Sequence, residues 1–216
     1  MSHYYEKKQK SQLNIQKLYT VLRGSSLEIF SGSGVFSKTR IDKGSMLLAN
    51  TAIIEENWKV LDFGCGYGVI GIAIAKAFPS CKVLLSDIND RAIMLAKRNI
   101  DLNKIKNAQA IQSDMFENIK NPEIFGAQKT KGFLGIPEKF NTILLNPPQS
   151  AGKEICMKMI EESKTHLLAG GLFQMVARHN FGGRELEKHM LRVYGNVNEL
   201  AKKSGYRIYV SELEET

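Results

Sequence analysis

The sequence predicts an α/β protein with a mostly parallel sheet and helices on both of its faces. From residue 58 onward, short apolar runs alternate with longer segments of helical periodicity. Such an alternation is typical of a doubly wound sheet, because each parallel strand requires a crossover connection. The expected strands are 58–63, 82–86, 108–113, 140–145, 172–177, 196–201 and 206–211, and the expected helices are 67–77, 89–103, 152–168 and 183–193.

Two places at the C-terminal end depart from simple alternation. A short turn around Ser204-Gly205 joins the last two strands, so these must be antiparallel. The Gly170-Gly171 pair is expected to separate a helix from strand 172–177. Ligands of such a sheet bind at the carboxyl ends of its strands, so we expect functional residues there.

The first fifty residues form a basic extension, with eight Lys and Arg against three Asp and Glu. Apolar residues at 17–22 and 27–30 flank a turn at 24–26, which predicts a β-hairpin. Ser45 or Asp42 is placed to cap a short helix. The expected division is a β-hairpin extension, residues 1–50, and a main domain, residues 51–216.

Composition indicates a globular protein of the cytoplasm with a polyanionic partner. Of the 216 residues, 43% are hydrophobic and 24% are charged, which are ordinary values for a globular domain. The net charge of +8 favours nucleic acid. Three separated cysteines indicate a reducing compartment. No histidine spacing indicates a metal, and no apolar run approaches the roughly 20 residues of a membrane span.

A glycine-rich turn between a strand and a helix is the central motif, and residues 60–71 read VLDFGCGYGVIG. Three alternate glycines permit positive φ and let the backbone approach a ligand closely. Two interpretations remain open here. Gly66, Gly68 and Gly71 match the dinucleotide pattern G-x-G-x-x-G, whereas Asp62 and the alternate glycines match the pattern used for S-adenosylmethionine.

Acidic residues end the next two strands. Asp87 follows the glycine turn by about twenty residues, where a carboxylate accepts hydrogen bonds from ribose hydroxyls. Asp114 is placed to accept a hydrogen bond from an adenine amino group, with Ile88 or Met115 packed on the ring. These positions predict a nucleoside subsite for either cofactor.

The motif Asn146-Pro147-Pro148-Gln149, directly after strand 140–145, decides between the cofactors. Two prolines fix φ and remove backbone donors, so the loop offers rigid acceptors in the Asn146 amide oxygen and the Pro147 carbonyl. Two acceptors can hold a planar –NH2 group and favour a lone pair directed at an electrophile. Hydride transfer has no use for this arrangement, so the motif favours methyl transfer.

Six motifs stand in a fixed order along the chain: Gly34-Val35-Phe36-Ser37, Asp42-x-Gly44-Ser45, Asp62-Phe63-Gly64-Cys65-Gly66-Tyr67-Gly68, Ser86-Asp87-Ile88-Asn89, Ser113-Asp114 and Asn146-Pro147-Pro148. This set resembles the class I S-adenosylmethionine-dependent methyltransferases, and within them the small-domain group that includes small-subunit ribosomal RNA guanine-N(2) methyltransferases and short archaeal relatives. The resemblance implies a Rossmann-like, doubly wound, seven-stranded sheet with an antiparallel last strand. It also implies S-adenosylmethionine as cofactor and a guanine amine of ribosomal or transfer RNA as acceptor.

The resemblance assigns roles to particular residues. The expected catalytic residues are Asn146, Pro147 and Pro148. Gly71 becomes a close-packing residue of the helix. Gln149 stands where related enzymes often have an aromatic or apolar residue, so base stacking is expected from elsewhere. The expected cofactor-binding residues are Asp62, Gly64, Cys65, Gly66, Tyr67, Gly68, Asp87, Ile88, Asp114, Met115 and Asn146. The expected substrate residues are Phe36, Gln149, His179 and Phe181.

Other functions stay open at this stage. The same acceptor pair suits a protein glutamine amide, and an adenine amine of DNA or RNA is a further acceptor. A non-catalytic RNA-binding module and an NAD-dependent oxidoreductase are the rivals from other classes. The long connection between Met115 and Phe140 is either a substrate-facing flap or an insertion. The sequence allows a monomer or a homodimer.

Overall fold

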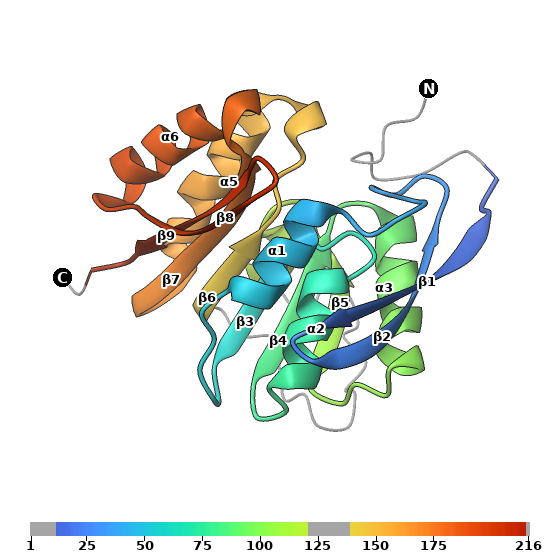
Figure 1. The fold of residues 1–216 in the computed structure, drawn as a ribbon. Coiled ribbons are helices and arrows are strands. Elements are labelled where there is room, and N and C mark those ends of the chain that lie inside the picture. Colours follow the sequence, from blue (N-terminus) through green and yellow to red (C-terminus); the bar gives the residue numbers. More distant parts are fainter. Residues whose placement is uncertain (1–11, 121–138, 215–216) are drawn as a thin grey trace.

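The computed structural model describes residues 12–120 and 139–214 of the chain (Figure 1). The question of a flap between Met115 and Phe140 concerns residues that mostly lie outside these ranges. Seven strands form the main sheet, in the order β5-β4-β3-β6-β7-β9-β8. Their bounds are β3 (Lys59–Phe63), β4 (Lys82–Asp87), β5 (Ala108–Gln112), β6 (Phe140–Leu145), β7 (Leu167–Arg178), β8 (Asn198–Lys203) and β9 (Tyr206–Glu212).

The strand directions confirm the predicted fold class. Strands β3 to β7 pair in parallel, whereas β9 lies antiparallel between β7 and β8. The turn at Ser204 joins β8 and β9 as expected, and Ser204 has a positive φ of 51°. The sheet is therefore a doubly wound Rossmann-like sheet with an antiparallel last strand.

The expected break at Gly170-Gly171 is wrong, because β7 begins at Leu167 and continues through both glycines. The helix before it, expected to reach residue 168, ends at Thr165. The pairing of β7 with β6 shifts in register between Leu167 and Leu172, which marks a β-bulge. Gly171 fits this bulge because a Cβ there would lie 2.7 Å from the Leu168 carbonyl oxygen. The glycines bend the strand rather than end it.

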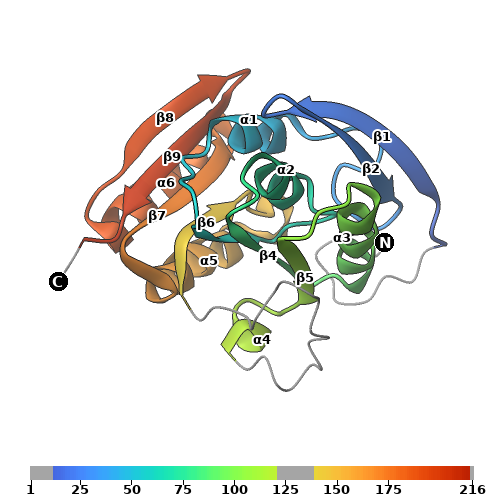
Figure 2. The ribbon, with the colours of Figure 1, turned by 90° about the horizontal axis from the view of Figure 1, so that it is seen from below.

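Helices cover both faces of the sheet (Figure 2). Strand residues alternate between two core clusters: Val60 packs with the helices of one face and Leu61 with those of the other. The first face carries α1 (Lys43–Thr51), α2 (Val69–Ala77) and α3 (Asp90–Leu102). The second carries α4 (Glu117–Lys120), α5 (Lys153–Thr165) and α6 (Arg184–Tyr194). Two further turns of helix among the described residues are η2 (Gln149–Ala151) and η3 (His179–Gly183).

The predicted N-terminal hairpin is confirmed, with β1 (Ile15–Leu22) antiparallel to β2 (Ser25–Gly32). It docks on the main domain through Asn99 of α3. The Asn99 amide accepts from the Phe30 backbone N–H at 2.6 Å and donates to the Phe30 carbonyl at 2.9 Å. Helix α1 lies beside α2 and shares its core cluster. The division of the chain at residue 50 stays a prediction.

Candidate active site

A cavity of about 410 Å³ opens at the carboxyl ends of β3, β4, β5 and β6. This is the edge at which doubly wound sheets bind their ligands. Its volume lies within the range of about 300–1,000 Å³ for small-molecule sites. The structure brings twelve predicted site residues together in its lining: Phe36, Gly64, Cys65, Gly66, Tyr67, Asp87, Ile88, Asp114, Met115, Asn146, Pro147 and Pro148.

The glycine turn leaves its cavity side open. Gly66 has a φ of +56°, and no atom lies within 4 Å of the position that a Cβ would occupy. Gly68 begins α2 with a φ of +91°, and a Cβ there would lie 2.9 Å from the Leu85 side chain. The two glycines therefore serve different purposes. Gly66 keeps a surface open for a ligand, whereas Gly68 lets the helix pack on β4 and does not line the cavity.

Asp87 is held beside this turn. Its Oδ2 accepts a hydrogen bond from the Gly66 backbone N–H at 2.8 Å, and its Oδ1 accepts one from the Asn89 N–H at 2.9 Å. Burial raises the pKa of Asp87, and the backbone N–H groups oppose that rise. Each carboxylate oxygen keeps a second lone pair, so Asp87 can accept further hydrogen bonds from a ligand in the cavity.

A buried hydroxyl next to Asp87 also awaits a partner. Ser86 lines the cavity and is 1% exposed, and its Oγ has no hydrogen-bond partner among the described residues. Buried polar groups are nearly always paired, with protein, water or ligand. The open face of Gly66 and the Asp87 carboxylate together fit a nucleoside with ribose hydroxyls, whereas the Ser86 hydroxyl is enclosed beside them.

Asp62 lies behind the glycine turn rather than in the cavity lining. It is 1% exposed, and its Oδ2 accepts a hydrogen bond from the Gly71 backbone N–H at 2.8 Å. A Cβ at Gly71 would lie 2.7 Å from the Leu85 side chain, which confirms Gly71 as a close-packing residue. Asp62 thus links the end of β3 to the first turn of α2 by a hydrogen bond. This bond stabilises the glycine turn that lines the cavity.

Burial without a cationic partner raises the pKa of Asp62 to about 7, while the Gly71 N–H opposes the shift and Asp87 adds to it. The folded state therefore retains a proton that the unfolded chain loses near pH 4. We expect the free energy of unfolding to fall as pH rises from about 4 to about 7, by up to about 1.4 kcal/mol per pH unit. Urea titrations at several pH values measure this fall.

The Asp62→Asn variant keeps an acceptor for Gly71 and has no titrating group. It should lose this part of the pH dependence. The matched control is Asp101→Asn in α3, at an exposed carboxylate, which should retain the wild-type slope. Equal slopes in the wild type and in Asp62→Asn would show that Asp62 titrates normally.

Asn146 has a defined orientation. Its Nδ2 donates hydrogen bonds to the Ser45 Oγ at 2.8 Å and to the Asp42 Oδ2 at 3.2 Å. A carboxylate accepts and does not donate, so the amide –NH2 must face Asp42. The Asn146 Oδ1 is then on the other side, and none of the described residues donates a hydrogen bond to it. Asn146 lines the cavity, and its Oδ1 can therefore accept a hydrogen bond from a ligand there.

Asp42 is the centre of this arrangement. Of the two residues that the sequence offered as a cap for α1, Asp42 is the one that caps it, because its Oδ2 accepts from the Ser45 backbone N–H at 2.9 Å. Its Oδ1 accepts from the Tyr206 hydroxyl at 3.2 Å. We call Asp42, Ser45 and Tyr206 the amide clamp. The motif Asp42-x-Gly44-Ser45 offered a signal for two of its members, as a helix cap and as part of the family resemblance but not as a support for Asn146, whereas nothing in the sequence pointed to Tyr206.

The structure does not bring His179 and Phe181 to the cavity. The His179 Nδ1 lies 2.8 Å from the Tyr209 hydroxyl, and its Nε2 accepts from the Arg184 Nε at 2.8 Å. Phe181 is 67% exposed in η3. Of the other expected substrate residues, Phe36 lines the cavity and is 39% exposed. Gln149 begins η2, and its side chain lies outside the described part.

Two further features concern the described residues alone. No three or more of their His, Cys, Asp and Glu side chains gather as a metal ion would require. None of their helices is both long and apolar enough to cross a membrane.

The doubly wound sheet with its antiparallel last strand, the glycine turn and the oriented asparagine at its edge are the features that the resemblance to class I methyltransferases implied. The family model of the methyltransferase small domain matches residues 26–210. The chain therefore belongs to the methyltransferase small-domain family.

Relatives of the chain are found among bacterial proteins. It is 33% identical to the uncharacterized protein YbxB of Bacillus subtilis, over 95% of this chain and 96% of that protein. It is 31% identical to ribosomal RNA small subunit methyltransferase C of Hamiltonella defensa, over 95% of this chain but 56% of that protein. The chain thus spans about half the length of its relatives of that name.

A solved structure supports the fold. The 16S rRNA N2 methyltransferase RsmC of T. thermophilus, in complex with AdoMet and guanosine, matches with a TM-score of 0.76. The match covers 95% of this chain and 52% of that one at 21% sequence identity.

Proposed function

We propose that this protein transfers a methyl group from S-adenosylmethionine to an exocyclic amine of a base in RNA, with guanine N(2) of ribosomal RNA as the acceptor. The observation that carries the proposal is the orientation of Asn146. Its –NH2 is bound by Asp42 and Ser45, so its Oδ1 remains as an acceptor at the cavity. An acceptor held in this way suits an amine donor.

The cavity residues fit the proposed cofactor. S-Adenosylmethionine supplies an electrophilic methyl group on a sulfonium. Asp87 would bind the ribose, and Asp114 would accept from the adenine amine. Ile88 and Met115 would pack on the base. These four residues line the cavity, and the open backbone at the glycine turn lies beside them.

The acceptor amine would be held by this chain through two oxygens. The Asn146 Oδ1 and the Pro147 carbonyl each accept one N–H bond of the –NH2 group. The lone pair of the nitrogen is otherwise delocalised into the base, and holding both N–H bonds favours its localisation. Proximity and orientation alone supply a large part of the rate of such a displacement. No side chain has to remove a proton beforehand.

Similarity and charge support ribosomal RNA as the substrate. Several relatives are named ribosomal RNA small subunit methyltransferase C, and the T. thermophilus structure contains guanosine. The net charge of +8 suits a polyanion. We place the activity in the cytoplasm, in agreement with three free cysteines among the described residues.

Incubation with tritiated S-adenosylmethionine tests the proposal. Ribosomal RNA, transfer RNA, DNA and a protein fraction are supplied separately, and we expect label in ribosomal RNA that survives protease and is lost with ribonuclease. Label confined to protein would favour the glutamine amide, which the same acceptor pair also suits. The absence of label in every fraction would leave the fold without the proposed activity.

The amide clamp gives a prediction about turnover. We expect Asp42→Ala to lower kcat by about tenfold to 100-fold, because the Asn146 amide is free to rotate and small misplacements are costly. Cofactor affinity should stay near the wild-type value. Ser45→Ala, which leaves the Asp42 carboxylate in place, should have the smaller effect. Initial rates at saturating cofactor and RNA measure both.

The control for the clamp is Thr51→Ala at the other end of α1, where the hydroxyl donates to the Leu47 carbonyl. That change affects the helix and not Asn146. An Asp42→Ala enzyme with wild-type kcat would show that the Asn146 amide does not need Asp42 to hold its orientation.

A further inference from the structure

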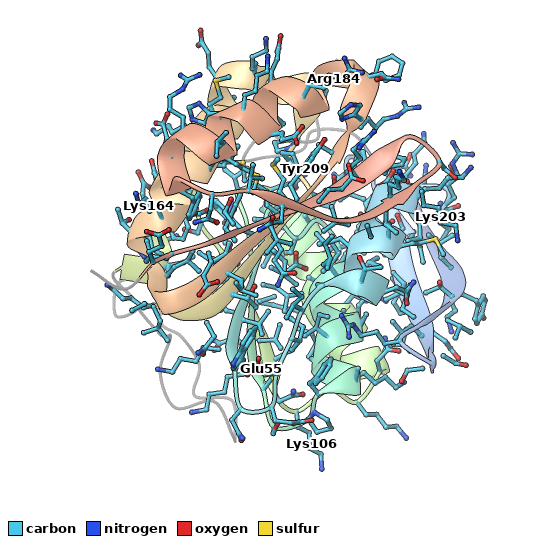
Figure 3. The ribbon with its side chains drawn as sticks, turned by 60° about the vertical axis from the view of Figure 1, so that its left-hand side comes forward. Glu55, Lys106, Lys164, Arg184, Lys203 and Tyr209 are labelled. Carbon is cyan, nitrogen blue, oxygen red and sulfur yellow. The ribbon has the colours of Figure 1, made fainter. Side chains whose placement is uncertain are left out.

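A second hollow, of about 460 Å³, lies between the loop after β7 and the turn from β8 to β9. We call it the basic hollow. Figure 3 shows two of its cations, Arg184 and Lys203, in the upper half of the molecule, away from Lys106 at the lower end. The lining residues that matter here are His179, Arg184, Lys202, Lys203, Tyr206 and Arg207.

Most of the positive charge in the basic hollow is not neutralised. Arg184, Lys202 and Lys203 are exposed and form no ion pair with a described carboxylate. Arg207 is paired with Glu199. The His179 pKa is lowered by partial burial and then by the charges of Arg207 and Arg184, against the weaker opposite effects of Glu187 and Glu199. The hollow therefore presents several cations to a ligand.

A further cation, Arg178 at the end of β7, lies beside two aromatic rings, and one of them, Tyr206, lines the hollow. The guanidinium of Arg178 lies 4.6 Å from the ring centre of Phe181 and 5.5 Å from that of Tyr206. Phe181 nevertheless remains 67% exposed. Exposed aromatic rings among Arg and Lys side chains are typical of surfaces that bind single-stranded nucleic acid, since bases stack on the rings while cations contact phosphates.

The basic hollow and the cavity are connected through the amide clamp. Tyr206 lines the hollow, and its hydroxyl donates to Asp42, which in turn accepts from Asn146 of the cavity. Figure 1 shows the turn from β8 to β9 beside α1, and Asp42 is the N-cap residue of that helix. The hollow and the cavity therefore lie at the same edge of the sheet, on either side of the amide clamp.

We propose that the basic hollow binds the phosphate backbone of the RNA strand whose target base enters the cavity. This inference rests on the proposed function and adds to it the surface that positions the strand. An acidic protein is the other class of polyanion that cations could bind. The exposed Phe181 beside Arg178 favours RNA, because a base can stack there.

The test uses the Lys202→Glu/Lys203→Glu double variant at two exposed positions of the β8–β9 hairpin. The control is Lys59→Glu/Lys82→Glu, which makes the same change of charge. Lys59 and Lys82 are exposed and adjacent in register at the amino-terminal edge of the sheet, opposite the cavity. Binding of protein-free ribosomal RNA fragments is followed by fluorescence anisotropy at several salt concentrations. Polyglutamate serves as a competitor.

We expect the Lys202/Lys203 variant to bind RNA about tenfold or more weakly, and its log–log salt slope to be smaller by about one to two. The Lys59/Lys82 control should lose far less RNA affinity. Calorimetry should show wild-type affinity for S-adenosylmethionine in both double variants. Equal RNA affinity of the Lys202/Lys203 variant and the control would overturn the inference. Competition by polyglutamate as effective as that by RNA would also overturn it.

Methyl transfer to the same RNA, measured in parallel, separates this inference from the proposed function. Suppose that the Lys202/Lys203 variant loses RNA affinity but the wild type transfers no methyl group. The basic hollow is then supported as an RNA-binding surface, and the proposed methyl transfer is contradicted. If the wild type methylates RNA and the variant does so with unchanged KM for RNA, the proposed methyl transfer is supported, but the RNA strand is bound by a surface other than the basic hollow.

Discussion

Replacement of Asn146 by alanine is expected to reduce methyl transfer by at least about 10²- to 10³-fold, because the acceptor amine loses the oxygen that orients it. The Asn146 Oδ1 is the acceptor that the amide clamp directs away from Asp42. Alanine would leave Pro147 as the one remaining acceptor of the proposed pair. Cofactor affinity should fall much less than the rate, because Asn146 is one of the expected cofactor contacts whereas Asp87 and the glycine turn are untouched.

The matched control is Asn141→Ala on the same strand. Asn141 lies at the other end of β6, where its Oδ1 accepts from the Lys59 backbone N–H at 2.8 Å. Loss of this hydrogen bond should cost about 1 kcal/mol of stability and leave transfer near the wild-type rate. Single-turnover rates measure the chemistry apart from binding. Near-wild-type transfer by Asn146→Ala would exclude the proposed role of the amide.

Replacement of Asp87 by alanine should have the opposite pattern, with cofactor affinity lowered by at least about 100-fold and turnover much less affected. The expected loss is that of hydrogen bonds from ribose hydroxyls to a charged acceptor, each of which contributes about 1.5–3 kcal/mol. The Gly66 N–H also loses its partner, so the glycine turn becomes less well ordered. At saturating cofactor, kcat should be affected much less than KM for the cofactor.

Asp90→Ala is the control for Asp87. Asp90 is exposed in the first turn of α3, three residues further along the chain. Its removal changes the local charge by the same amount without touching the glycine turn. Titration calorimetry with S-adenosylmethionine should therefore give near-wild-type affinity for this variant. Equal affinities of Asp87→Ala and Asp90→Ala for S-adenosylmethionine would show that Asp87 does not bind the ribose.

Much of the fold could be predicted because its signals are local. The period of apolar residues changes between strand and helix along the chain, and short or long connections fix whether neighbouring strands are antiparallel or parallel. Gly170 and Gly171 misled the prediction for a physical reason. Glycine permits a bulge as readily as a chain break, and the register between β6 and β7 decides between them.

The cavity residues were also accessible from sequence, since carboxyl ends of parallel strands meet at one edge of a sheet. The complete amide clamp could not be predicted from the sequence, because the hydrogen bond from Tyr206 to Asp42 joins residues 164 positions apart. His179 follows a strand end but turns toward β9, where its backbone N–H donates to the Gly205 carbonyl at 3.0 Å. Position at a strand end does not fix the direction of the chain beyond it.

The measurement that tests the central claim most directly is mass spectrometry of nucleosides from ribosomal RNA, after incubation with wild-type protein and S-adenosylmethionine that carries a deuterated methyl group. The proposed function predicts deuterated N(2)-methylguanosine, and its absence from RNA incubated with Asn146→Ala. Label in N(6)-methyladenosine, in a methyl group on a ring carbon, or in no nucleoside would contradict it.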